Sequence, residues 1–266
     1  MITRDFQSKK IPVLGLGCMR LPTIDGDYSK IDKNNLSQML DYAIKNGLKY
    51  FDCAWGYHHG NAESVMGELL KKYPRDSFYL ATKFPGYDLT NMDKVEEIFE
   101  EQLKKCRVEY FDFYLVHNVC EANIEAYLDR KNGIIEYLFE QKKNGRIKHL
   151  GFSAHGLMPT LKRFLEACGD KMEFCQLQLN WLDWKLQNAR SKLDLVKEYN
   201  LPVWVMEPLR GGKLLSPGEE YESRLLFDGH YNTMTEWGFR FLQSIPEVAV
   251  ILSGMSNMEQ LTENIE

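Results

Sequence analysis

Short apolar runs alternate along the chain with longer segments that have one apolar face and one charged face. Near-continuous apolar runs are typical of strands buried on both sides of a parallel sheet. Eight such runs occur, and they predict strands over residues 13–17, 50–54, 78–83, 111–117, 147–154, 174–180, 202–208 and 248–254.

The segments between these runs predict amphipathic helices. In residues 34–46, Leu36, Met39, Leu40 and Ala43 recur at the spacing that places side chains on one helix face. Similar patterns predict helices over residues 34–46, 62–72, 93–105, 133–143, 159–167, 186–199 and 233–243, and an eighth helix that begins near Asn257. Because the sequence stops at Glu266, we expect this last helix to be truncated.

A strand followed by a helix, repeated eight times, predicts a single-domain (β/α)8 TIM barrel over residues 1–266. An open, doubly wound sheet is the alternative, but it usually carries a G-x-G-x-x-G loop after its first strand. The first strand here leads into GLGCMRLP, residues 15–22, which lacks that pattern. Residues 209–232 form the longest irregular stretch, which is typical of a functional loop.

Charge and composition narrow the classes of partner. The net charge of −5 gives no general electrostatic reason to bind nucleic acid. No apolar run approaches the roughly 20 residues that cross a bilayer, and the N-terminus lacks the apolar core of a signal peptide. We therefore expect a cytoplasmic protein, a monomer or weak oligomer, that acts on small molecules. The six cysteines form no C-x-x-C pair, so we expect reduced thiols and no metal or iron–sulfur site.

Ionisable and polar residues stand at or just after three successive predicted strands: Asp52, Tyr57, Lys83 and His117. Each has an ordinary structural explanation on its own, but strand ends of a barrel converge on one mouth. Tyr57 could donate a proton to an alkoxide if the cation of Lys83 lowered the pKa of the phenol. Asp52 could hold that cation in place, and His117 could donate a hydrogen bond to a carbonyl oxygen.

The motifs around these residues resemble those of the aldo-keto reductases. The likeness runs through residues 50–70, 80–83, 113–117 and 151–153, then Gln176, and then residues 208–214 and 253–264. It implies an NAD(P)H-dependent oxidoreductase that transfers hydride to an aldehyde or ketone, or catalyses the reverse alcohol oxidation. It also implies a catalytic tetrad of Asp52, Tyr57, Lys83 and His117. A cofactor-binding regulatory barrel without catalysis is the alternative function.

The same resemblance implies where the nicotinamide cofactor lies. Ser153 and Gln176 match positions that bind the carboxamide, although Ala154 stands where many members have Asn. Leu209, Gly211 and Gly212 match the loop beside the pyrophosphate. The residues that match the adenosine end are Gly254, Ser256, Gln260, Glu263 and Asn264.

Gly254 and Gln260 stand where NADPH-preferring members often have Lys and Arg, so we expect weak discrimination between NADPH and NADH, or a lean toward NADH. Arg210 and Lys213 are the cations nearest in the sequence.

The chain looks most like a bacterial subgroup in which some members carry a C-terminal iron–sulfur segment; this sequence has none. We interpret His58 as a solvated or substrate-contacting loop residue. The aromatic residues that either line an apolar mouth or pack against the barrel are Trp55, Tyr87, Trp181 and Trp184.

Overall fold

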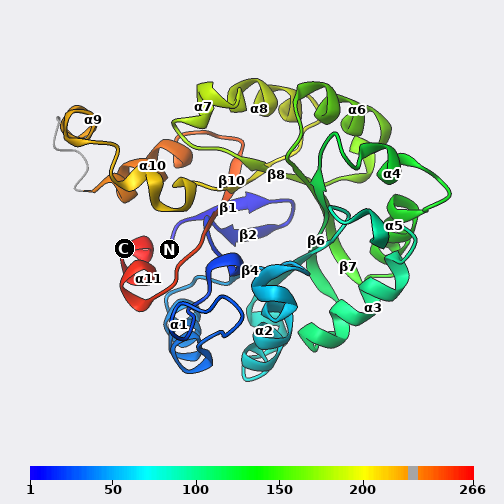
Figure 1. Ribbon diagram of the computed structural model, residues 1–266, viewed down its shortest axis with the longest axis horizontal. Coiled ribbons are helices and arrows are strands. Elements are labelled where there is room, and N and C mark those ends of the chain that lie inside the picture. Colours follow the sequence, from blue (N-terminus) through cyan, green and yellow to red (C-terminus); the bar gives the residue numbers. More distant parts are fainter. Residues whose placement is uncertain (227–232) are drawn as a thin grey trace.

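The computed structural model describes residues 1–226 and 233–266. Eight parallel strands close into a barrel in the order β10-β3-β4-β5-β6-β7-β8-β9, which confirms the predicted TIM barrel (Figure 1). Every predicted strand is present within a few residues of its expected bounds. The barrel strands are β3 (Leu14–Gly17), β4 (Tyr50–Asp52), β5 (Tyr79–Phe84), β6 (Phe111–Val119), β7 (Ile147–Ala154), β8 (Phe174–Gln178), β9 (Val203–Met206) and β10 (Val248–Ser253).

A helix follows each barrel strand and packs on the outside of the barrel (Figure 1). These eight helices are α1 (Lys33–Lys45), α2 (Ala62–Leu70), α3 (Val95–Cys106), α5 (Ile134–Lys143), α6 (Met158–Cys168), α8 (Ala189–Glu198), α10 (Met234–Gln243) and α11 (Met258–Ile265). In α1, Asp32 caps the first turn by accepting from the amide of Asn35 at 3.0 Å, and the predicted apolar face is buried.

Short helical segments stand between these main elements. They are α4 (Ile124–Leu128), α7 (Asp183–Leu186), α9 (Glu219–Leu225), η1 (Cys18–Arg20), η2 (Tyr57–Gly60), η3 (Arg75–Ser77), η4 (Leu89–Asn91), η5 (Gly169–Lys171) and η6 (Arg210–Leu215). The expectation of one irregular stretch over residues 209–232 was therefore wrong for η6 and α9. Residues 227–232 lie outside the part of the chain that the structure describes.

A β-hairpin that the hydrophobic pattern did not predict closes the amino-terminal end of the barrel. Its strands β1 (Thr3–Phe6) and β2 (Lys9–Pro12) pair antiparallel, and only Phe6, Ile11 and Pro12 are buried. Two four-residue strands with mostly exposed, charged side chains give too little alternation to be recognised in sequence.

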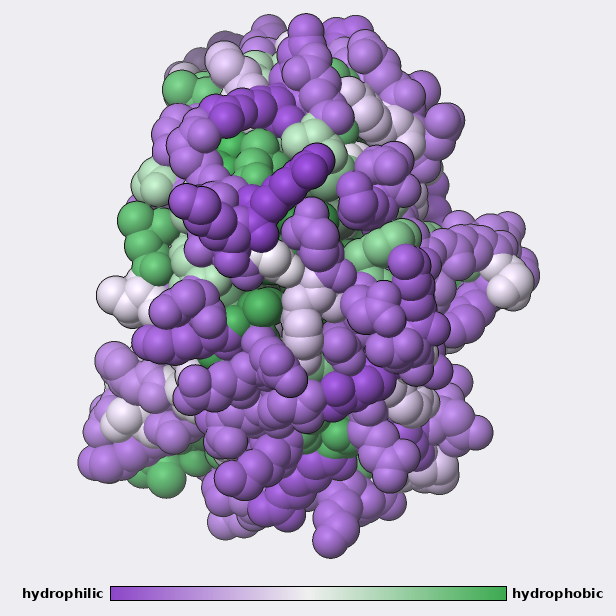
Figure 2. All heavy atoms as spheres, turned by 90° about the vertical axis from the view of Figure 1, so that its right-hand side faces the viewer, coloured by the Kyte–Doolittle hydropathy of each residue, from purple (hydrophilic) through white to green (hydrophobic). Residues whose placement is uncertain are grey.

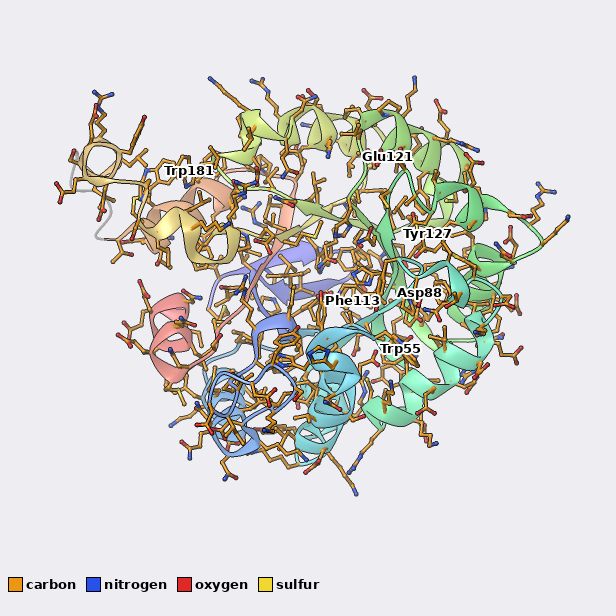
Figure 3. The ribbon with its side chains drawn as sticks, viewed as in Figure 1. Trp55, Asp88, Phe113, Glu121, Tyr127 and Trp181 are labelled. Carbon is orange, nitrogen blue, oxygen red and sulfur yellow. The ribbon has the colours of Figure 1, made fainter. Side chains whose placement is uncertain are left out.

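The hairpin completes the aromatic core inside the barrel. The ring of Phe6 lies 5.7 Å from that of Phe113 and 5.1 Å from that of Trp204, and Phe174 lies 4.5 Å from Trp204. Figure 3 shows Phe113 in the barrel interior beside the hairpin. These side chains fill the amino-terminal half of the barrel, which leaves the carboxyl ends of the strands to form a site.

The surface gives little sign of a large apolar interface on the face in Figure 2, where hydrophilic side chains dominate and apolar ones occur in separate small groups. Among the described helices, none combines the length and the apolar character that a membrane span requires.

The packing of Phe6 predicts a measurable contribution to stability. Replacing it with Ala leaves a cavity among aromatic rings, and we expect the free energy of unfolding to fall by about 3 kcal/mol. Phe6→Leu keeps an apolar side chain and removes less volume, so it should cost less, about 1–2 kcal/mol. Urea denaturation followed by circular dichroism measures both; equal midpoints for Phe6→Ala and the wild type would contradict this role.

Candidate active site

The carboxyl ends of β4, β5 and β6 bring the predicted tetrad together. Asp52 ends β4, Tyr57 begins η2 in the loop that follows, and Lys83 and His117 lie in β5 and β6. Asp52, Tyr57 and His117 line one cavity of about 710 Å³. Lys83 lies behind them and is 1% exposed.

Lys83 and Asp52 form a buried ion pair. The ammonium Nζ donates to Asp52 Oδ1 at 2.5 Å and to the carbonyl oxygen of Cys53 at 2.5 Å. Burial is the largest single influence and disfavours the charge on Lys83, but the Asp52 carboxylate and the Tyr57 oxygen together outweigh it and raise the pKa of the ammonium above its ordinary value. Lys83 is therefore a fixed cation, and its Nζ lies 5.1 Å from the centre of the Tyr57 ring.

Tyr57 keeps its proton throughout the neutral range. Burial raises the pKa of its phenol to about 12, and the cation of Lys83 acts in the opposite direction. The predicted direction of the Lys83 effect is thus correct, but the expected net lowering was wrong because desolvation of the phenolate is the larger effect.

His117 stands across the cavity as a neutral imidazole. Its ring lies 6.5 Å from that of Tyr57 at an interplanar angle of 83°. Burial, followed by repulsion from Lys83, lowers the pKa of His117 well below its ordinary value. Its Nδ1 has no hydrogen-bond partner among the described residues. A neutral imidazole retains one N–H group, which can donate to an oxygen placed near Tyr57.

A buried polar network fixes the strand that carries Lys83. Glu63 Oε1 accepts from Thr82 at 2.6 Å and from Gln102 at 2.7 Å, and Gln102 also donates to the Lys83 carbonyl oxygen at 3.0 Å. Glu63 and Gln102 are fully buried. Glu63 lies within residues 50–70, where the resemblance was noted, whereas Gln102 reaches the strand only because α3 packs against β5.

The residues predicted to hold the carboxamide differ in position. Gln176 lines the cavity, and its Nε2 lies 3.5 Å from Asp52 Oδ2. Ser153 is fully buried beside it and does not line the cavity; its hydroxyl oxygen accepts from the amide of Asn118 at 2.7 Å. His155, which the sequence analysis did not assign, lines the cavity with its ring 6.1 Å from that of His117.

Leu209, Gly211 and Gly212 line the cavity at the loop after β9. Gly211 and Gly212 adopt φ values of +65° and +90°, which favour glycine. A Cβ atom on Gly211 would lie 2.5 Å from the Arg20 guanidinium, so a side chain there would displace this cation.

Arg20 was missed by sequence reasoning, because it follows the first strand and lies far along the chain from this loop. It lines the cavity together with Lys213, and neither side chain forms an ion pair with a described residue. Arg210 instead pairs with buried Asp183, with its Nε 3.2 Å from Asp183 Oδ2. Arg210 therefore anchors the loop to α7.

The residues predicted for the adenosine end all line the same cavity: Gly254, Ser256, Gln260, Glu263 and Asn264. Gln260 accepts from the Ser256 amide at 2.8 Å, and the Ser256 hydroxyl donates to the Arg20 carbonyl oxygen at 2.9 Å. The cavity thus combines the neutral groups Tyr57 and His117 with the glycines of the loop after β9 and the cations Arg20 and Lys213. This donor set fits a nicotinamide dinucleotide, whose diphosphate needs close backbone approach and positive charge.

The structure corrects or refines several other predictions. His58 is fully buried, so the expectation of a solvated or substrate-contacting residue was wrong. Tyr87 lies against His117, with the rings 5.4 Å apart, whereas Trp181 packs against Trp237 at 5.8 Å near α10 (Figure 3). The cavity lining does not include Trp55, Tyr87, Trp181 or Trp184. Across residues 1–226 and 233–266, no group of three His, Cys, Asp or Glu side chains could hold a metal ion.

Comparison with known proteins places the chain in a family. The model of the Aldo/keto reductase family matches residues 13–266. The chain is 25% identical to the uncharacterized oxidoreductase YqkF of Bacillus subtilis, over 96% of this chain and 87% of that protein. It is 23% identical to the NADH-specific methylglyoxal reductase of Escherichia coli, over 97% of this chain and 92% of that protein.

Solved structures share the fold. The holo form of aldo-keto reductase AKR11C1 from Bacillus halodurans matches with a TM-score of 0.79 and 22% identity, over 100% of this chain and 90% of that one. An aldo-keto reductase from Klebsiella pneumoniae in complex with NADPH matches with a TM-score of 0.76 and 18% identity, over 100% of this chain and 89% of that one. Barrel, tetrad and family match agree, and the chain belongs to the aldo/keto reductase family of NAD(P)H-dependent oxidoreductases that act on carbonyl groups.

Proposed function

We propose that Tyr57 is the proton donor of a carbonyl reduction in which Lys83, Asp52 and His117 assist. The observation that carries this proposal is the buried Lys83–Asp52 pair beneath a protonated phenol, with a neutral imidazole across the cavity. The substrate is a small aldehyde or ketone, or an alcohol in the reverse direction. When bound, the nicotinamide supplies or accepts the hydride.

The proton transfer follows from the charges of the protein groups. As the carbonyl oxygen gains negative charge, the Tyr57 hydroxyl can pass its proton to that oxygen. The phenolate left behind is stabilised by the Lys83 ammonium, whose Nζ is 5.1 Å from the ring centre. His117 orients the carbonyl through its remaining N–H group. Asp52 keeps Lys83 charged and in place.

We propose that the cofactor lies along the length of the cavity. Gln176 binds the carboxamide, with Ser153 beneath it, and Leu209, Gly211 and Gly212 approach the diphosphate together with Arg20. The adenosine end is formed by the residues predicted from sequence: Gly254, Ser256, Gln260, Glu263 and Asn264. The known relatives include one with NADH in its name and one bound to NADPH, so both cofactors are candidates.

The alternative of a regulatory, non-catalytic barrel gains no support from the site, because a binding role alone needs no buried cation beneath a tyrosine. We further propose that residues 1–266 act as one domain in the cytoplasm, as a monomer or weak oligomer, without a nucleic acid or membrane partner. The cavity at the barrel mouth has the size of a small-molecule site.

Tyr57→Phe tests the proton donor. We expect kcat for aldehyde reduction to fall by about 10²–10⁴-fold, because the general acid is removed, while NADH or NADPH binds as in the wild type. Absorbance at the reduced-nicotinamide band measures the rate, and fluorescence titration measures binding. Full activity in the variant would contradict the proposal. Tyr87→Phe, beside His117 but outside the cavity lining, is the matched control.

The neutral residues at the adenosine end predict weak cofactor discrimination. A bound 2′-phosphate would find no lysine or arginine at residues 254 and 260, and would lose charge-assisted hydrogen bonds of about 1.5–3 kcal/mol each. We expect KM values for NADH and NADPH within about tenfold of each other, or lower for NADH. A preference for NADPH of about a hundredfold would show that another cation, such as Arg20, binds the phosphate.

Asp52→Asn tests the buried ion pair. The variant leaves Lys83 buried without a counter-charge, and we expect the free energy of unfolding to fall by about 3–5 kcal/mol. Without the carboxylate, burial depresses the pKa of Lys83, so the unfolded state binds more protons and stability rises with pH. Glu68→Gln breaks the exposed pair with Lys33 and should cost less than about 1 kcal/mol. Urea denaturation measures both, and similar losses of unfolding free energy in Asp52→Asn and Glu68→Gln would contradict the stabilising role of the buried pair.

A further inference from the structure

His58 directly follows Tyr57, and its buried imidazole has no role in the chemistry described above. Its Nε2 accepts from the Leu21 amide at 3.2 Å, and its Nδ1 lies 2.8 Å from the carbonyl oxygen of Tyr28. A carbonyl oxygen only accepts, so Nδ1 carries the proton and Nε2 offers its lone pair. Both ring nitrogens are therefore used, and only the neutral Nδ1–H tautomer satisfies both contacts.

These contacts tie together segments that come from different parts of the site. Leu21 directly follows η1, whose Met19 and Arg20 line the cavity. Tyr28 lies in the excursion between β3 and α1, and its ring stacks on His58 with the centroids 4.3 Å apart. A second side chain, Asn61, also joins these two loops by donating to the carbonyl oxygen of Ser29 at 3.2 Å, but of the described side chains only the His58 ring reaches both Leu21 and Tyr28.

The backbone at His58 also needs this support. His58 and its neighbour His59 both adopt φ of +53°, in the left-handed region that non-glycine residues avoid. Such residues persist where the surroundings fix them. The two hydrogen bonds and the stacked Tyr28 ring provide that restraint immediately after the proton donor.

We propose that His58 is a positioning residue that holds the proton donor Tyr57 and the cavity wall formed by Met19 and Arg20 in one fixed arrangement. The inference rests on the proposed function, since it concerns the same cavity. Leu21 adjoins Met19 and Arg20 in the cavity wall, and Tyr28 lies farther along the same loop, so the Leu21 contact fixes the wall directly and both contacts hold the turn that carries Tyr57. One imidazole thereby links cofactor affinity to proton transfer.

The arrangement is sensitive to protonation of His58. Burial lowers the pKa of His58, the carbonyl groups of Tyr28 and Cys18 favour the charged ring, and the nearby His59 opposes it. The groups that face the imidazole are therefore the carbonyl oxygens of Tyr28 and Cys18, the His59 ring and the Tyr28 ring. In the imidazolium, Nε2 has no lone pair for the Leu21 amide, so protonation releases η1 from the cluster.

Two conservative variants separate the contacts. In His58→Gln, the side-chain oxygen reaches the former Nε2 position and can accept from Leu21; in His58→Asn, the amide reaches the Nδ1 position and can donate to Tyr28. We expect His58→Gln to keep its affinity for NAD⁺ or NADP⁺ within about twofold and His58→Asn to lose about tenfold, the equivalent of one hydrogen bond. Both variants should retain part of kcat, because each keeps one of the two contacts that hold the Tyr57 turn.

A pH series gives a readout that loss of folding alone would not produce. Because burial lowers the pKa of His58 below its ordinary value, nucleotide affinity of the wild type should weaken only as the pH falls well below the pKa of a free imidazole, whereas His58→Gln, which cannot titrate, should hold its affinity. His59→Gln is the matched control, because His59 has the same φ but is exposed, and it should follow the wild type. The same nucleotide is used for all variants, so any protonation of the nucleotide itself affects every curve equally.

The outcomes separate this inference from the proposed function. Equal affinities and equal pH responses in the wild type and both His58 variants would overturn the positioning role while leaving the reductase intact. A wild-type protein that neither binds NAD⁺ or NADP⁺ nor reduces any aldehyde would overturn the proposed function, and the inference with it. If His58→Asn fails to fold, the pH response of His58→Gln against the wild type still decides the question.

Discussion

The ion pair between Lys83 and Asp52 is the constraint on which the rest of the site depends. A lysine that is 1% exposed stays charged only because a carboxylate oxygen lies 2.5 Å from its Nζ. The two residues come from neighbouring strands, so the barrel must close in this register to bring them together. The Glu63–Gln102 network then holds the strand of Lys83 from behind. A fold without this order would bury an uncompensated charge.

The two ends of the barrel have different roles. Aromatic rings and the amino-terminal hairpin fill one end and contribute stability, with Phe6 seated among Phe113 and Trp204. At the other end the strands carry Asp52, Lys83 and His117, and the loops carry Tyr57 and the residues proposed to hold the cofactor diphosphate. Those loops are held by specific polar contacts, namely Asp183 with Arg210 after β9 and His58 with Leu21 and Tyr28 after β3 and β4. The site can therefore vary in its loops without disturbing the core.

Sequence reasoning succeeded where a local pattern has a direct physical meaning. Buried parallel strands appear as apolar runs, and the carboxyl ends of such strands share one mouth, so the four residues of the predicted tetrad could be expected to lie close together. It failed where the outcome depends on residues far apart in the chain. The hairpin is too short and too exposed to show alternation, and the placement of Arg20 depends on a glycine nearly two hundred residues later. The burial of His58 required knowing that Leu21 and Tyr28 surround it.

The high pKa of Tyr57 is compatible with its role as an acid, and it bears on the direction of the reaction. Burial raises that pKa to about 12, so nearly every molecule holds the phenol proton at neutral pH. An alkoxide is a stronger base than a phenolate, so transfer from Tyr57 to the reduced carbonyl oxygen still runs downhill. Oxidation of an alcohol would instead begin from the phenolate, which is scarce at neutral pH and is favoured only by Lys83. The same burial that keeps the proton on Tyr57 therefore slows alcohol oxidation at neutral pH, and Lys83 opposes that effect by stabilising the phenolate, while the equilibrium between carbonyl and alcohol is unchanged.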